Sequence, residues 1–448
     1  MKPASEIPRP AGSLVSHTRR FVKNTMQFYE ESFRECGDIF TTRIPGLGNW
    51  TYICSPDLVK AVFEAPPDVV SADIEGFSVA RVLGRGATSQ LDGPAHKERR
   101  DVISPYLGAQ ESARQVDGIR RITERRLAEW PLGQPFKLVL ALQKISLEAL
   151  IHLLFAGVDP ERARQLADLW EDFSFKGMRS LTVPHTSLQL DFPGSPWRKV
   201  KQRREKVQTA FLQEIEERLA AEPTEADGFV LGMARARLRD GSQLSREIIL
   251  SEILDLLFQG HEQTGNSMTW TLGELLTHPE ALARLRQELE TVAGQGDLQS
   301  GHLADLPYLD AVVYEGLRRR PNNLFTGLRM VKKPFALGGY LLPEGSLVAV
   351  SYPAQSVRPD LFAHPERFDP GHFYQKQKPP AEAWSPFGSG AHACAGKDFA
   401  IVVIKTVLAT IVRKADLKLA QSEIKPVRNA YYYEPNQGLL VTFDSRRS

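Results

Sequence analysis

The sequence predicts a mainly α-helical fold with small β-sheets (α+β), and two patterns support this class. Apolar residues recur at helical spacing through most of residues 108–220 and again through 246–277. Short stretches rich in β-branched and aromatic residues, bounded by glycine and proline, favour strands instead. We expect one domain over residues 1–448, with a β-rich portion at about 37–55 and 327–350 and helices at about 92–320 and 394–415.

The composition is that of a globular protein and narrows the classes of function. Of the 448 residues, 42% are hydrophobic and 25% are charged, and the formal net charge of +2 makes no case for a nucleic-acid partner. Three cysteines in this length predict no disulfide framework and indicate a reducing compartment. No run of about 18 apolar residues and no signal peptide is present, so we expect no transmembrane helix and no membrane anchor.

The N-terminal part predicts a helix followed by a β-hairpin. Residues 24–36 carry a helical pattern, and residues 37–44 and 50–54 favour two strands around a glycine-rich turn. Ser55 and Pro56 then favour the start of another helix, as N-cap and first-turn residue.

Two polar features lie within predicted helices and need an explanation. His96 and Arg100 stand four residues apart, on one face of a basic helix, where a solvated face is the plain interpretation. Residues 246–277 form a long helix whose apolar stripe is interrupted by the polar segment 259–264. Glycine and polar side chains are costly in mid-helix, so this segment indicates a kink where a ligand or water approaches the backbone.

A cysteine follows the glycine-rich loop at residues 387–393 and stands where we expect a helix to begin, at about Cys394. Unpaired N–H groups and the helix dipole at such a position lower a thiol's pKa, which predicts a thiolate. No Cys-x-x-Cys pair or nearby His or Asp supports a zinc site or a protease-like dyad. A single-thiolate iron ligand remains, as in haem ligation by cysteine, and the alternative is a buried structural cysteine.

The spacing Phe387-x-x-Gly390-x-x-x-Cys394-x-Gly396 resembles the haem-binding signature of the cytochrome P-450 superfamily. The resemblance covers about residue 8 to the C-terminus and implies the P-450 fold, with a long central helix over one haem b. It makes Cys394 the proximal iron ligand, with Phe387 and Gly396 in the cofactor-binding loop. The residues that it assigns to the haem propionates are His96, Arg100, Arg329 and His392.

The polar segment of the long helix resembles the family's oxygen-binding motif but departs from it. Gly260, Glu262 and Thr264 fit, whereas Gln259 replaces a small residue and Gln263 stands where a threonine hydroxyl is expected. An amide cannot relay a proton as a hydroxyl does, and Thr264 lies about 100° further around the helix. Proton delivery would then depend on Glu262, water or a hydroxyl of the substrate, unless Gln263 holds an equivalent water and ordinary chemistry follows.

The resemblance assigns two further sets of residues. Glu315 and Arg318 would form a structural lock with Arg367. Asn323, Leu324 and Phe325 would line the substrate pocket. Residues 173–192 would form a lid, and their aromatic and aliphatic side chains suit an apolar ligand.

Three hypotheses follow from the resemblance. The leading one is a cytoplasmic, monomeric monooxygenase of secondary metabolism that inserts one oxygen atom from O2 into a lipophilic small molecule by hydroxylation or epoxidation. Its electrons would come from a separate ferredoxin or flavodoxin and its reductase, so that NAD(P)H acts only indirectly. The second is a haem-thiolate enzyme without the usual O2 activation, which acts as a peroxygenase, an isomerase or dehydratase, or an oxidative coupling catalyst. The third is a non-enzymatic haem-based ligand binder.

Overall fold

A computed structural model describes residues 1–44, 48–72, 74, 83, 86–174, 191–220, 228–323, 326–429 and 432–446. The helices are α1 (Leu14–Lys23), α2 (Thr25–Cys36), α3 (Pro56–Glu64), α5 (Gly93–Leu107), α6 (Ala109–Arg114), α7 (Val116–Ala128), α8 (Leu138–Leu154), α9 (Pro160–Glu171), α10 (Pro196–Ala220), α11 (Phe229–Arg235), α12 (Arg246–Thr277), α13 (Pro279–Ala293), α14 (Pro307–Arg319), α15 (Tyr352–Ser356) and α16 (Lys397–Lys414). The strands are β1 (Lys2–Pro3), β2 (Ile39–Ile44), β3 (Gly48–Ile53), β4 (Val70–Ser71), β5 (Phe136–Lys137), β6 (Thr326–Val331), β7 (Phe335–Leu337), β8 (Tyr340–Leu342), β9 (Leu347–Val350), β10 (Ala415–Leu419), β11 (Pro426–Asn429), β12 (Tyr432–Pro435) and β13 (Leu440–Arg446).

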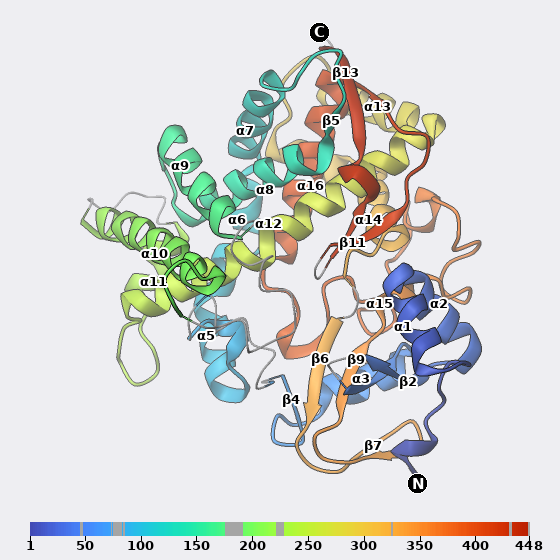
Figure 1. Cartoon of the computed structure of the whole chain (residues 1–448). Helices are drawn as coiled ribbons and strands as arrows, with labels where there is room; N and C mark the ends of the chain where they lie inside the picture. The colour runs from blue at the N-terminus through green and yellow to red at the C-terminus, as the bar shows by residue number, and fades with distance from the viewer. Residues whose placement is uncertain are drawn as a thin grey trace.

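The largest sheet joins segments from both ends of the chain. Its strand order is β2-β3-β9-β6-β4, in which β2 and β3 form the expected antiparallel hairpin and β3 runs parallel to β9. The sheet lies toward the N-terminal end of the molecule, and the C-terminus lies at the opposite end (Figure 1). The sheet therefore joins the two portions that were predicted to be β-rich, at about 37–55 and 327–350, although nearly 300 residues separate them in the sequence.

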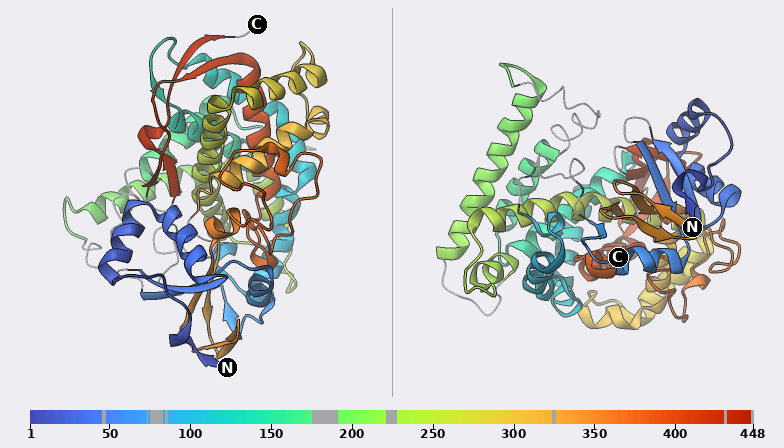
Figure 2. Two further views of the ribbon diagram at one scale, coloured as in Figure 1. Left: turned by 90° about the vertical axis from the view of Figure 1, so that its right-hand side faces the viewer. Right: turned by 90° about the horizontal axis from the view of Figure 1, so that it is seen from below.

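Helix α12 passes through the middle of the helical part and organises it (Figures 1 and 2). It crosses α8 closely, because a Cβ at Gly265 would lie only 2.7 Å from Cγ of Gln143. A hydrogen bond of 3.0 Å from Gln143 to Asn266 fixes the same crossing. The apolar stripe residues Leu254 and Leu257 are fully buried, so burial of this stripe stabilises the helix more than propensity does.

The long helix has the predicted bounds, residues 246–277, but it is not broken at its polar segment. Residues 259–264 continue as one helix, and the Thr264 hydroxyl adds a hydrogen bond to the Gly260 carbonyl. A bend of the helix axis at this segment stays a prediction. Helix α16 begins at Lys397, three residues after the start that the sequence indicated. No helix among the described residues is both long and apolar enough to span a bilayer.

Candidate active site

The loop before α16 is folded tightly around Cys394. Gly388 and Gly390 both have positive φ angles, of 68° and 70°, which favour glycine. The Cys394 N–H donates to the carbonyl of Phe387 at 2.8 Å and closes the loop. A Cβ at Gly390 would lie 3.1 Å from Cβ of Phe63 on α3, so glycine is required by both conformation and space.

Cys394 is an exposed residue, yet burial raises the pKa of its thiol, and the backbone N–H of Gly396 and the charge of Arg100 only partly oppose the rise. Helix α16 begins three residues after Cys394, so the thiol does not lie in the first turn as the sequence indicated. The thiolate state of Cys394 stays a prediction, because it concerns the sulfur when it acts as a ligand.

Two of the predicted propionate residues are stacked on one another. The rings of His96 and His392 lie 3.8 Å apart between centroids, with 23° between their planes. Burial, followed by the charges of His392 and Arg100, lowers the pKa of His96 to about 4. His392 Nε2 lies 3.2 Å from Oδ1 of Asp92, a residue that the sequence did not single out.

Asp92 is held as a carboxylate at the base of this cluster. Burial alone would raise its pKa, but hydrogen bonds from the Ala72 N–H, His392, the Gly93 N–H and Ser71 bring it down to about 2. Because Asp92 is also the N-cap of α5, it links the start of that helix to the cysteine loop. Its position before Gly93-Pro94 was the signal that could have identified it.

Arg100 and Arg329 complete the cluster, and the partners of their guanidinium groups indicate whether a haem fits beside them. Burial lowers the pKa of Arg329 to about 10 and that of Arg100 less strongly. Among the described residues, no acid forms an ion pair with either guanidinium, and Arg329 lies over the ring of Phe63 at 5.0 Å. Two arginines without an ion-pair partner among the described residues, of which Arg329 is buried and Arg100 half-buried, fit a group that carries carboxylates. Cys394 can supply the thiolate ligand that such a group takes in haem b.

The two glutamines in the polar segment of α12 each form a hydrogen bond with a neighbouring side chain. Gln259 is exposed although it lies in mid-helix between buried Leu257 and His261. Its Nε2 donates to Oδ2 of Asp255 at 2.8 Å. Gln263, four residues on, accepts at Oε1 from Nδ2 of Asn323 at 3.1 Å.

The other members of the predicted oxygen-binding motif have different surroundings. The buried Thr264 hydroxyl donates to the Gly260 carbonyl at 2.6 Å, so this hydroxyl is already used by the backbone. A Cβ at Gly260 would lie 2.9 Å from the side chain of Leu150, so Gly260 lies on the face of α12 that packs against α8. Glu262 Oε1 lies 3.9 Å from Nε2 of His261. The motif is thus divided between two faces of α12, with Gln259 and Gln263 sharing one of them.

Two buried acids precede this segment and were missed from the sequence. Glu252 accepts hydrogen bonds from the Thr88 N–H and hydroxyl, at 2.8 and 2.6 Å, and an ion-pair hydrogen bond from Arg99 at 3.0 Å. Asp255 is only 5% exposed, and burial raises its pKa to about 7. Their spacing of three residues on a predicted buried helix was the available signal, since acids are rarely buried without a purpose.

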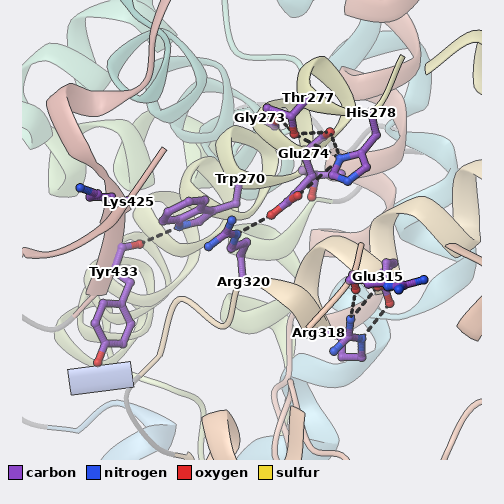
Figure 3. Close-up of polar contacts among 12 residues, drawn as sticks. Trp270, Gly273, Glu274, Thr277, His278, Glu315, Arg318, Arg320, Lys425 and Tyr433 are labelled. Carbon is purple, nitrogen blue, oxygen red and sulfur yellow. Dashed lines mark hydrogen bonds and ion pairs between the residues drawn. The ribbon is translucent and has the colours of Figure 1, made fainter. Parts of the chain in front are cut away.

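The predicted structural lock exists, but with a different third partner. Arg318 makes two hydrogen bonds to Glu315, of 2.8 and 2.7 Å, and both side chains are almost fully buried (Figure 3). The prediction that Arg367 joins them through its side chain is wrong. That side chain is 72% exposed, and only its backbone carbonyl accepts from Arg318. His372 meets Glu315 instead, with Nδ1 3.1 Å from Oε2. Both basic residues precede a phenylalanine, so the sequence offered two candidates.

The predicted pocket residues are only partly described. Asn323 lies beside Gln263, whereas Leu324 and Phe325 fall outside the described residues, as does most of the expected lid at 175–190. Asn322, which was not predicted, donates to the Gln263 carbonyl at 2.8 Å and to Ser267 at 2.9 Å.

Comparison with known proteins identifies the family. The family model described as cytochrome P450 matches residues 8–440. The chain belongs to the cytochrome P450 family. A Mycobacterium tuberculosis protein provisionally named cytochrome P450 135B1 is 29% identical over 447 residues, which covers 98% of this chain and 91% of that protein. Another from that organism, provisionally named cytochrome P450 138, is 29% identical over 92% of this chain and 90% of its own length.

Solved P450 structures share the fold. A structure described as retinoic acid bound cyanobacterial CYP120A1 has a TM-score of 0.84 and 23% identity, and covers 99% of this chain and 100% of its own. The cytochrome P450DA heme domain has a TM-score of 0.85 and 18% identity, with coverage of 98% and 97%. This chain is therefore an enzyme of the P450 monooxygenase class, whose members bind haem b and receive electrons from redox partner proteins.

Proposed function

We propose that this protein inserts one oxygen atom from O2 into a C–H or C=C bond of a lipophilic small molecule, by hydroxylation or epoxidation. The observation that carries the proposal is exposed Cys394 beside a cluster with two arginines, buried Arg329 and half-buried Arg100, that form no ion pair among the described residues. Haem b, when bound, supplies the redox chemistry that activates dioxygen.

Each part of the cluster has a role in this proposal. Cys394 would ligate the iron, within the loop that the Phe387 carbonyl closes and from which Gly396 leads into α16. The propionates would be held by His96, Arg100, Arg329 and His392. Imidazole N–H groups and guanidinium groups both donate hydrogen bonds to carboxylates.

The electrons come, in this proposal, from a ferredoxin or flavodoxin with its reductase, and ultimately from NAD(P)H. Exposed Lys397, at the start of α16, lies close enough to Cys394 for its charge to act on the thiol, and an acidic partner would find complementary charge there. The cytoplasmic location, the monomeric state and the place in secondary metabolism remain predictions.

One observation favours a second function without the usual O2 activation. Thr264 donates to a backbone carbonyl, and the Gln263 amide is bonded to Asn323, so neither presents a hydroxyl for proton transfer. A peroxygenase, an isomerase or dehydratase, or an oxidative coupling catalyst would not need that relay. No observation favours a non-enzymatic ligand binder.

An oxygen-labelling experiment separates these functions. The holoenzyme is given NAD(P)H, surrogate redox proteins and a lipophilic substrate found by screening, under heavy oxygen gas. Incorporation of one labelled atom into the product supports the monooxygenase, whereas unlabelled product that forms without electron donor, or only with peroxide, supports the second function. A Cys394→Ser variant that keeps the red-shifted carbonyl spectrum of thiolate ligation would contradict the assigned ligand.

A further inference from the structure

The glutamine pair on α12 combines polar side chains with access from outside the helix. Gln259 is exposed and Gln263 is half-buried, whereas Asp255, His261 and Thr264 nearby on the same helix are buried. The two residues are four apart and share a helix face, about 6 Å apart along the axis. Their long side chains can therefore reach the same small group.

The Gln259 carboxamide has a fixed orientation. Its Nε2 donates to Oδ2 of Asp255, and an ionised carboxylate can only accept hydrogen bonds. The amide therefore turns its NH2 group toward Asp255 and its oxygen away. No described residue donates to Gln259 Oε1, which leaves an acceptor directed at the accessible side of the helix.

The Gln263 carboxamide has the opposite orientation. Its Oε1 accepts from Asn323 Nδ2 at 3.1 Å, so its NH2 group points elsewhere. Asn322 adds a hydrogen bond to the Gln263 carbonyl and so fixes the loop that carries Asn323. Within the described part of the chain, Nε2 of Gln263 has no acceptor, and it offers a donor next to the acceptor of Gln259.

An oriented acceptor beside an oriented donor selects among ligand groups. A hydroxyl both donates and accepts from one atom and satisfies both glutamines. A carbonyl or ether oxygen only accepts and satisfies Gln263 alone, whereas an ammonium only donates and satisfies Gln259 alone. An apolar group leaves both amides without partners, which costs binding free energy.

We propose that Gln259 and Gln263 recognise a hydroxyl group on a lipophilic alcohol, with Asp255 and Asn323 as the residues that orient the two amides. This deepens the proposed function, because it names the substrate class of the same site. It also assigns the substitution at Gln263 a role in selecting the substrate.

The test measures equilibrium binding to the ferric holoenzyme without any electron donor, by titration of the haem spin state. The probes are matched triplets: 1-dodecanol, its methyl ether and tridecane, and cholestanol, its methyl ether and cholestane. Work at pH 8, above the Asp255 pKa of about 7, keeps that carboxylate an acceptor. We expect the alcohol of at least one triplet to bind about tenfold more tightly than its ether, and the ether about fivefold more tightly than the hydrocarbon.

Each variant should remove one step of this ranking. We expect Gln259→Leu to lower the affinity for the alcohol to that for the ether. Gln263→Leu should lower the affinity for the ether to that for the hydrocarbon. Gln213→Leu on α10 is the matched control, because Gln213 is also an exposed helical glutamine whose Nε2 donates to an acid four residues away, at 2.8 Å. If a leucine variant fails to fold, Gln→Met at the same position replaces it.

The orienting residues have a separate readout. Asp255→Asn can present either a donor or an acceptor to Gln259, so we expect the alcohol-to-ether affinity ratio to fall, while hydrocarbon affinity changes little. A purely structural role would weaken all three probes alike. No preference for the alcohol in any triplet, or a preference that survives both leucine variants, overturns the proposal. Because binding is measured without turnover, either result leaves the oxygen-labelling test of the proposed function unaffected.

Discussion

Replacement of Arg318 by alanine should destabilise the protein severely. Its guanidinium is 1% exposed and makes five hydrogen bonds: two to Glu315 and one each to the carbonyls of Ser356, Pro365 and Arg367. The bonds join α14 to the segment that leads toward Cys394. Their loss leaves three carbonyls and one buried carboxylate without their main partner.

The size of the effect can be estimated from these contacts. Removal of one member of a buried ion pair costs about 3–5 kcal/mol, because the other charge stays buried and unpaired. Glu315 keeps the Asp369 N–H at 2.8 Å and His372 at 3.1 Å, which lessens the penalty. The three lost carbonyl bonds increase it again. We therefore expect about 4 kcal/mol, a large share of the 5–15 kcal/mol that stabilises a typical domain.

Urea unfolding of the holoprotein, followed by far-ultraviolet circular dichroism and by the Soret band, measures this change. Arg367→Ala is the matched control, because that side chain is 72% exposed and should change stability by less than about 0.5 kcal/mol. His372→Ala should fall between the two. If Arg318→Ala costs less than about 1 kcal/mol, or Arg367→Ala costs as much as Arg318→Ala, the assigned lock is incorrect.

Three further predictions concern other parts of the structure. Folding raises the pKa of Asp255 from 3.8 to about 7, so its contribution to stability is complete below about pH 4 and is lost as the pH rises to 7. At pH 8, Asp255→Asn should thus be more stable than the parent by up to about 4 kcal/mol, at about 1.4 kcal/mol for each unit of pKa shift. At pH 4 the variant should have no such advantage, and equal pH profiles of the two proteins in urea unfolding would refute the prediction. Arg329→Leu should speed haem transfer to apomyoglobin by about tenfold, and an unchanged rate would exclude a role in propionate binding. Gly316→Ala places a Cβ 2.1 Å from Oγ1 of Thr271 where α14 meets α12, and should cost about 1–3 kcal/mol; a melting temperature equal to the parent's would show that the helices separate easily.

Local sequence predicted the long helix well, for a physical reason. The apolar stripe that includes Leu254 and Leu257 is buried before the polar segment, and apolar side chains such as Met268 and Leu272 are buried after it, so burial supports a helix over 246–277. Residues 259–264 stay helical although they are polar, and the Thr264 hydroxyl bonds to the carbonyl of Gly260. Whether polar residues break a helix depends on the partners that they find, and sequence spacing does not show those partners.

The distal residues illustrate the same limit more strongly. The sequence identified Gln259 and Gln263 as a departure from the family pattern and placed them on one face. Asp255 stands four residues before Gln259 on the same helix face, so helical spacing could have shown that contact, although it was not predicted. The contact that orients Gln263 comes from Asn323, 60 residues away, and arises only from tertiary packing.

By itself, the sequence determined the fold class, the loop that presents Cys394 and the identity of the residues around it, because glycine conformation, helical periodicity and fixed spacing are local properties. The tertiary structure decided which charges meet. It brought His96 and His392 into contact across nearly 300 residues, supplied Asp92 beneath them, and replaced Arg367 with His372 at the lock. Ionisable side chains pair by distance in space and by burial, and these depend on how helices and loops far apart in the chain pack together.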